Sequence, residues 1–262
     1  MSNLRDALES GKFGVTAEMA PPKGFDFTEQ LEAAELLAGK VHAVNVTDMQ
    51  SASLKASGIG LCIKLKQAGV DPILQITGRD RNRMAIMGDV LSAASFGIDT
   101  MLALTGDHPV VGDCKQSKPV YEPRMLQINK LRQKVEAGAR YIQTQGIFDM
   151  DSLKRFMDDV AAAGIDVPIM AGIIPLKAAG MAKFMNQNVP GIDVPQSMID
   201  RLEAAAAEGK EKGVKGLPMK LGMEMAAEMI AKIKEENICP GVHIMAIGAE
   251  KNVPAILEMT GI

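Results

Sequence analysis

The carboxyl group of Glu18 is the first residue along the chain whose setting suggests chemistry. It lies in the run 15–20, whose other members are uncharged, and Pro21 and Pro22 follow directly. Because proline cannot donate a hydrogen bond to a neighbouring strand, this run predicts a short buried strand that ends at or before Pro21. A carboxyl group there is desolvated, which favours its protonated form and suits it to donate a proton. The alternative is a buried glutamate that pairs with a lysine or arginine of a neighbouring strand.

Asp107 provides a second carboxyl group, and it follows Gly106 at the end of another apolar run. Glycine permits close approach of the backbone to a ligand, although an aspartate after glycine is also common as a helix or turn cap. Gln143 and Gln145 alternate along a later strand, so we expect both on one face, either in a site or in a core hydrogen-bond network. Two acids with uncharged hydrogen-bonding groups suit a polar heterocycle and proton transfer.

The histidines and cysteines offer no ready-made metal site. No His-x-x-x-His or Cys-x-x-Cys spacing occurs, and no motif surrounds a serine or cysteine nucleophile. We therefore predict no metal. The residues concerned are His42, His108, His243, Cys62, Cys114 and Cys239.

Composition narrows the classes of protein further. The formal net charge of −3 argues against nucleic acid as the main partner, because phosphate binding needs a basic face. No apolar run approaches the ~18 residues of a membrane span. The first residues lack the apolar core of a signal peptide, and three scattered cysteines suggest a reducing compartment. We expect a cytoplasmic protein.

Strands and helices alternate along the whole chain. The expected strands are 15–20, 41–47, 72–77, 99–105, 141–145, 167–174 and 242–247. The expected helices are 1–12, 27–37, 53–68, 82–96, 123–137, 152–163, 178–186, 196–212, 219–237 and 253–259. This alternation predicts parallel β-α units in a single α/β domain over residues 1–262. No Gly-x-Gly-x-x-Gly follows the first strand, which favours a (β/α)8 TIM barrel over a dinucleotide-binding sheet.

Seven strands, where a full barrel has eight, indicate an abbreviated or irregular barrel around the fifth strand. The segment from Asp107 to Tyr141 has room for a polar loop and one helix, and either Val110–Val111 or Val120–Tyr121 could supply a stub of a strand. In a barrel, the active face is lined by residues at the ends of the strands and in the loops that follow. The polar residues at those positions are Glu18, Asn45, Thr47, Asp48, Gln75, Thr77, Arg79, Asp80, Asp107, His108 and Gln145. The charged run 79–83 is either a solvated loop or a holder for an anionic group.

Nine segments in order, over nearly the whole chain, resemble the methylenetetrahydrofolate reductase family in the version found in anaerobes with a folate-based one-carbon pathway. Each segment is weakly specific alone, and the nine together are strongly specific. They are 17–22, 44–48, 75–83, 104–108, 134–139, 143–149, 172–176, 185–191 and 241–246.

The resemblance implies a flavin-bearing (β/α)8 barrel that reduces 5,10-methylenetetrahydrofolate to 5-methyltetrahydrofolate. By this resemblance, Glu18 would be the acid that opens the methylene bridge, and Asp107 would favour the cationic intermediate. The substrate-binding residues would be Gln145, Asn45 and Met185. The residues that match flavin-contacting positions are Thr47, Gln75, Thr105, Gly106, Tyr121 and Lys134.

One segment departs from the family pattern. Between the Tyr121 region and the Lys134 helix, the family normally has a further strand and helix that help to hold the flavin, so the choice between FAD and FMN stays open. One alternative is a flavin-free methyltransferase that exchanges a methyl group between tetrahydrofolate and a corrinoid protein. Another is a non-catalytic subunit whose partner chain covers the shortened edge. We expect an oligomer, and an electron-donating or corrinoid protein as partner.

Overall fold

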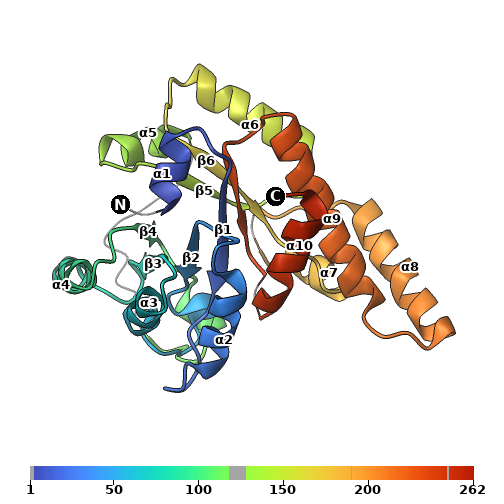
Figure 1. The fold of residues 1–262 in the computed structure, drawn as a ribbon, viewed down its shortest axis with the longest axis horizontal. Coiled ribbons are helices and arrows are strands. Elements are labelled where there is room, and N and C mark those ends of the chain that lie inside the picture. Colours follow the sequence, from blue (N-terminus) through green and yellow to red (C-terminus); the bar gives the residue numbers. More distant parts are fainter. Residues whose placement is uncertain (1–2, 118–127, 190, 247) are drawn as a thin grey trace. The chain divides into compact units, whose positions relative to one another are not determined.

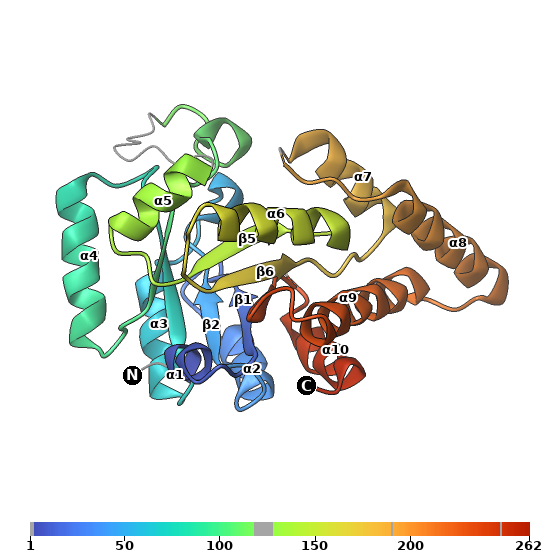
Figure 2. The ribbon, with the colours of Figure 1, turned by 90° about the horizontal axis from the view of Figure 1, so that it is seen from above.

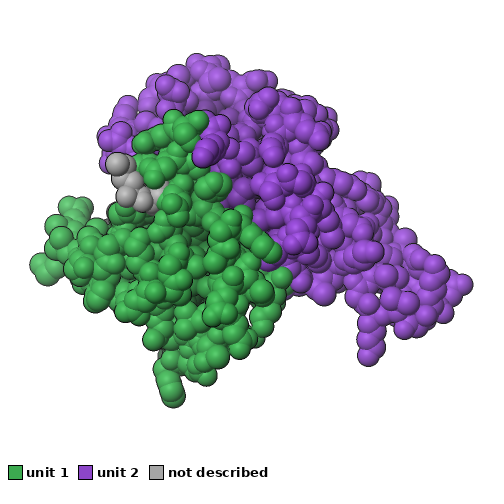
Figure 3. All heavy atoms as spheres, viewed as in Figure 1, with its two compact units in different colours: residues 1–10, 16–130, 247–251 green, residues 11–15, 131–246, 252–262 purple. Residues whose placement is uncertain are grey.

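The computed structural model describes residues 3–117, 128–189, 191–246 and 248–262, which form two compact units (Figure 3). Unit 1 comprises residues 1–10, 16–130 and 247–251, and unit 2 comprises residues 11–15, 131–246 and 252–262. The organisation of residues 1–262 as a single domain stays a prediction.

Unit 1 is built on four strands in the order β4-β3-β2-β1, and neighbouring strands are parallel (Figure 1). Its strands are β2 (Ala43–Val46), β3 (Pro72–Thr77), β4 (Met101–Leu104) and most of β1 (Gly14–Met19). Its helices are α1 (Asn3–Glu9), α2 (Thr28–Leu37), α3 (Gly58–Gln67) and α4 (Arg83–Ser95), with the short 3-10 helices η1 (Gln50–Ala52) and η2 (Pro109–Val111).

The first three strands of unit 1 are buried along their whole length. This explains why they read as continuous apolar runs, since a parallel strand covered on both faces has no solvent side. Helix α3 packs on β2 and β3 and buries Leu61 and Leu65, which are four residues apart and therefore share one face of the helix. These strands form a rigid support for the residues at their carboxyl ends.

Strand β4 and helix α4 carry several exposed apolar side chains. Leu104 in β4 is exposed, and α4 exposes Met84, Met87 and Leu91. The buried residue of α4 is Ala93. Unit 1 therefore presents apolar side chains at its surface from both β4 and α4.

Unit 2 contains the strands β7-β6-β5 in that order, with parallel pairing between β6 and each neighbour. The strands are β5 (Ile142–Gly146), β6 (Ile169–Ile173) and β7 (Gly241–Ile244). The helices are α5 (Ile128–Glu136), which begins in unit 1, α6 (Met150–Ala162), α7 (Ala179–Asn188), α8 (Gln196–Lys212), α9 (Leu217–Glu235) and α10 (Val253–Thr260). The 3-10 helix η3 (Glu250–Asn252) has residues in both units. The start of β1 belongs to unit 2, where the Gly14 N–H donates to the Pro240 carbonyl at 2.9 Å.

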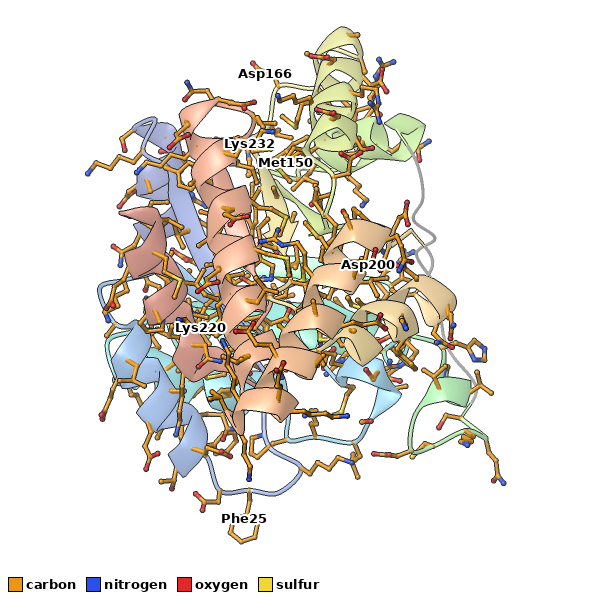
Figure 4. The ribbon with its side chains drawn as sticks, turned by 90° about the vertical axis from the view of Figure 1, so that its right-hand side faces the viewer. Phe25, Met150, Asp166, Asp200, Lys220 and Lys232 are labelled. Carbon is orange, nitrogen blue, oxygen red and sulfur yellow. The ribbon has the colours of Figure 1, made fainter. Side chains whose placement is uncertain are left out.

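Two groups of helices pack against these strands. One core cluster joins α5, α6 and β6 through Leu131, Val160 and Ile169. Helix α9 packs against both α8 and α10 (Figure 2). Lys220 and Lys232 lie near opposite ends of α9, on its solvent-exposed side (Figure 4). An apolar inner face and a charged outer face are typical of helices that cover a sheet.

The seven strands and ten helices of the described residues confirm the predicted element order and the abbreviated (β/α)8 fold class. In the described part of the segment between Leu104 and Ile142, no strand is present. The prediction of a strand stub at Val110–Val111 was wrong: both residues belong to η2, because Pro109 begins a tight turn and His108 Nδ1 accepts the Val110 N–H at 3.2 Å. The other candidate stub, Val120–Tyr121, lies outside the described residues.

Candidate active site

Buried polar side chains gather at the carboxyl ends of the strands of unit 1. Parallel pairing places Glu18 of β1 opposite Asn45 of β2, and both are buried. The polar residues that follow along β2 and β3 are buried as well; they are Thr47, Asp48, Gln75, Thr77 and Arg79. Burial of polar groups costs free energy unless they are hydrogen-bonded, so such a cluster needs internal partners or a ligand.

Glu18 is 6% exposed, and two side-chain amides donate to its carboxyl group. Gln50 Nε2 donates to its Oε1 at 3.2 Å, and Gln75 Nε2 donates to its Oε2 at 3.3 Å. An amide can present either its N–H groups or its carbonyl oxygen after a half-turn, so glutamine partners satisfy both the charged and the protonated form of a carboxyl group. This arrangement suits a group that gains and loses a proton.

Asp107 is exposed, and its side chain is held by the residue next to Gln50. The Ser51 N–H donates to Asp107 Oδ2 at 2.9 Å. The side chain of His108, not that of Asp107, caps the turn that follows. The carboxylate of Asp107 is bonded instead to η1. The two carboxyl groups are thus linked through two consecutive residues, Gln50 and Ser51.

Thr47 has a hydroxyl group with no partner among the described residues. Its side chain is 1% exposed, and Oγ1 is fully buried without a hydrogen bond in the part of the chain that the structure describes. Its backbone is in place, because the Thr47 N–H donates to the Met19 carbonyl at 3.0 Å. A buried hydroxyl in this state is a candidate to bond a ligand.

Gly106 has a backbone conformation that favours glycine, with φ of +84°. A Cβ atom at this position would lie 3.0 Å from Thr77 Cβ and 3.2 Å from Arg79 Cβ. The neighbouring Thr105 is exposed. The absence of a side chain at Gly106 therefore lets the backbone before Asp107 lie directly against the end of β3.

Arg81, in the charged run after β3, is bonded to carboxylates of two neighbouring segments. Arg81 forms a fork on Asp48, with Nη1 at 2.6 Å from Oδ2 and Nη2 at 3.1 Å from Oδ1, and its Nε donates to Asp89 at 2.8 Å. Burial alone would lower the pKa of Arg81, but the hydrogen bonds and negative charge of Asp48 and Asp89 outweigh it, and the pKa is raised. Asp48 also accepts the N–H and hydroxyl of Thr77. Asp48 and Arg81 therefore have a structural role: they bind the ends of β2 and β3 to each other.

Three of the predicted site residues belong to unit 2. Met185 is buried on α7, Gln145 is exposed at the end of β5, and Lys134 is half-buried on α5, where desolvation lowers its pKa. A bulge between Gln143 and Gly146 interrupts the strict alternation expected of β5. That Met185, Gln145 and Lys134 lie beside Glu18 stays a prediction. Tyr121 lies outside the described residues.

The described residues hold neither a metal-binding cluster nor a membrane-spanning helix. They contain no cluster of three or more histidine, cysteine, aspartate or glutamate residues that could hold a metal ion. None of their helices combines the length and hydrophobicity that a membrane crossing requires.

A family model described as methylenetetrahydrofolate reductase matches residues 3–127 and 116–261. The chain belongs to the methylenetetrahydrofolate reductase family. The two matched ranges overlap at 116–127. Family membership was predicted from the sequence and is confirmed.

Relatives differ in how much of their length this chain spans. The 5,10-methylenetetrahydrofolate reductase of Pectobacterium carotovorum is 28% identical over 272 residues, which cover 90% of this chain and 89% of that protein. Methylenetetrahydrofolate reductase 2 of Saccharomyces cerevisiae is 30% identical over 163 residues, 60% of this chain and 26% of that protein. The probable methylenetetrahydrofolate reductase (NADPH) of Caenorhabditis elegans is 24% identical, and 34% of its length is covered. The chain thus spans about a third or less of these eukaryotic relatives.

Among solved structures, the EDTA monooxygenase EmoA from Chelativorans sp. BNC1 is similar in fold. The TM-score is 0.55 at 11% sequence identity, with 95% of this chain and 94% of that chain covered. At this identity the likeness concerns the fold alone.

Proposed function

We propose that this protein reduces 5,10-methylenetetrahydrofolate to 5-methyltetrahydrofolate with the help of a bound flavin. The observation that carries the proposal is the linkage of Glu18 and Asp107 through the consecutive residues Gln50 and Ser51. One is a buried acid between two amides, and the other is an exposed carboxylate. The family to which the chain belongs, and the names of its relatives, favour this reaction.

Glu18 would donate the proton that opens the methylene bridge. Protonation of the bridging nitrogen at position 10 breaks its bond to the methylene carbon, and the carbon stays on nitrogen 5 as an iminium cation. The proton comes from the carboxyl group of Glu18. The carboxylate that remains is stabilised by the N–H groups of Gln50 and Gln75, which already donate to it. A positioned general acid contributes a factor of about 10²–10⁴ to such a step.

Asp107 would stabilise the iminium cation. Its carboxylate is fixed by the Ser51 N–H and lies on a backbone that Gly106 allows to approach β3 closely. A negative charge about 4 Å from the cation contributes on the order of 4 kcal/mol at the effective dielectric constant of a protein surface. Because the charge on the substrate develops during the reaction, this attraction acts on the transition state more than on the bound substrate.

The residues of unit 1 fit a flavin in one specific respect, the buried hydroxyl of Thr47, whose Oγ1 has no partner among the described residues. A bound flavin would supply the hydride that converts the iminium carbon into a methyl group. Thr47, Gln75, Thr105 and Gly106 would contact it from unit 1, and Lys134 and Tyr121 are proposed to complete the set. FAD and FMN are both compatible with these residues.

Asn45, Gln145 and Met185 are proposed to bind the folate. Asn45 is fully buried on β2 opposite Glu18, so the two residues would act from neighbouring strands. The electron donor would be a nicotinamide nucleotide or a partner protein. We further propose a cytoplasmic oligomer.

A visible absorption spectrum tests the proposal. The purified protein, reconstituted with FAD or FMN, should show the absorbance of a bound oxidised flavin. Anaerobic addition of 5-methyltetrahydrofolate should bleach that absorbance by running the reaction backwards. A protein that takes up no flavin, or whose flavin stays oxidised while the folate binds, would refute it. Methyl transfer to a corrinoid in the absence of flavin would establish the methyltransferase alternative.

A further inference from the structure

Arg79 is a buried cation near the candidate site, and four of its N–H groups donate hydrogen bonds within the chain. The residue is 2% exposed and donates four hydrogen bonds. Two go to Asp80, from Nε to Oδ1 at 2.9 Å and from Nη2 to Oδ2 at 2.6 Å. The other two go to backbone carbonyl oxygens, from Nη1 to that of Asp107 at 3.0 Å and from Nη2 to that of Met49 at 3.2 Å. The hydrogen bond to Asp80 raises the pKa of Arg79, so the guanidinium stays charged.

The two carbonyl groups belong to the two segments that carry the partners of Glu18 and Asp107. Met49 directly precedes Gln50, whose amide bonds Glu18, and the other carbonyl belongs to Asp107 itself. One guanidinium group therefore bridges η1 and the loop after β4. The two bonds to Asp80 fix the orientation of the guanidinium plane. The same plane donates the bonds to the carbonyls of Met49 and Asp107.

The segment that Arg79 restrains has a strained backbone. Met49, Ser51 and Ala52 have φ values of 46°, 56° and 52°, in the left-handed region that residues with side chains rarely adopt. Such a conformation persists only when its surroundings hold it in place. The restraints include the bond from Arg79 to the Met49 carbonyl and the bond from the Asp113 N–H to the Ala52 carbonyl at 3.1 Å.

We propose that Arg79 is a positioning residue that holds Glu18 and Asp107 in working geometry by fixing the strained segment 49–52 against the loop after β4. Without the guanidinium bridge, the segment relaxes toward ordinary backbone angles. Gln50 then withdraws from Glu18, and the Ser51 N–H withdraws from Asp107. A binding site for an external anion at Arg79 is the competing interpretation, and four of its five N–H donors are already used within the chain.

Amide hydrogen exchange measures the restraint directly and does not depend on the proposed function. In the Arg79→Gln variant, we expect the Ser51 amide to exchange about tenfold faster or more than in the wild type, because its bond to Asp107 opens more often. The amides of Val44 and Leu74, which donate to the carbonyls of Asp71 and Thr100 just before the neighbouring strands, should exchange at the wild-type rate. Arg132→Gln is the matched control, since it removes an exposed arginine that donates to the Ala163 carbonyl at 2.8 Å in unit 2.

Unchanged protection of Ser51 in a folded Arg79→Gln variant would overturn the proposal. If that variant does not fold, Arg79→Lys decides, because lysine keeps the charge but lacks the planar fork. We expect intermediate exchange at Ser51 in that variant, and wild-type protection there would also overturn the proposal.

A second readout rests on the proposed function. In Arg79→Gln, kcat should fall by about 10- to 100-fold while KM for the folate changes much less, since the lost geometry matters most in the transition state. An equal loss in both Arg79→Gln and the Arg132→Gln control would point to a general effect on stability. A wild-type protein without reductase activity would refute the proposed function, and the exchange experiment would still decide the role of Arg79.

Discussion

Replacement of Glu18 by glutamine tests the role of the buried acid with little change in shape. Glutamine has nearly the same size as glutamate but cannot donate a proton as an acid. Both neighbouring amides can still be satisfied if one of them turns its carbonyl oxygen toward the new N–H group. We expect the free energy of unfolding to change by about 1 kcal/mol or less, and the reductive step to slow by about 10²–10⁴-fold. That factor corresponds to roughly 3–5 kcal/mol of activation free energy.

The Glu18→Ala variant separates this chemical effect from packing. Alanine leaves the N–H groups of Gln50 and Gln75 without their carboxylate partner, and Gln75 is 6% exposed. An unsatisfied buried donor costs about 1–3 kcal/mol, so this variant should lose stability as well as activity. Glu35→Gln, on the exposed side of α2, is the matched control and should behave like the wild type.

Stopped-flow measurement of flavin reoxidation by 5,10-methylenetetrahydrofolate gives the rate of the reductive step. Chemical denaturation gives the free energy of unfolding. The reasoning predicts a slow but stable Glu18→Gln variant. A variant that keeps its rate within about fivefold of the wild type would refute the role of Glu18 as the acid, because a general acid contributes at least ~10²-fold.

Three further predictions follow from single residues. Thr47→Val removes a buried hydroxyl that has no partner among the described residues, so thermal stability should not fall, while flavin affinity measured by fluorescence titration should drop about fivefold; unchanged affinity would argue against a flavin contact. Gly106→Ala forces a side chain into a backbone with φ of +84° and should cost about 1–3 kcal/mol in urea denaturation, whereas an unaltered midpoint would show that the loop adapts freely. Burial raises the pKa of the Cys62 and Cys239 thiols to about 12, so at pH 8 an aromatic disulfide reagent should titrate only the exposed Cys114 in the native protein and three thiols after denaturation. Because unfolded thiols ionise near pH ~8.5, the contribution of the two buried thiols to stability should be lost as pH rises from about 9 to 12.

The order of strands and helices could be predicted because the parallel strands are buried on both faces and therefore appear as short apolar runs. The strand 72–77 was predicted with the bounds that the structure shows. The helix expected at 53–68 begins at Gly58, because the residues before it form η1 and an extended connection. A helix was predicted over residues 82–96, where the structure has α4, but the exposure of its apolar residues could not be predicted, since a sequence does not reveal whether a neighbour is present to cover them.

The candidate site was only partly accessible from the sequence. Glu18 and Gln75 were found because they are polar residues near the carboxyl ends of otherwise apolar strands, and the structure joins them by a hydrogen bond. Gln50 and Ser51 were missed. They lie in a segment whose left-handed residues are not glycines, so the usual sequence signal for such a turn is absent. The bond from Arg79 to the Met49 carbonyl spans 30 positions and leaves no pattern in the sequence.

The most direct test of the account is the fate of hydrogen in a single turnover in D2O. Reduced, flavin-loaded protein is mixed anaerobically with 5,10-methylenetetrahydrofolate, and the methyl group of the product is analysed by mass spectrometry. Because the transferable hydrogen of a reduced flavin exchanges with solvent, the account predicts one deuterium in the methyl group of 5-methyltetrahydrofolate, formed at a rate that Glu18→Gln reduces by at least ~10²-fold. A methyl group without deuterium, or no methyl product from a protein that binds both flavin and folate, would contradict it.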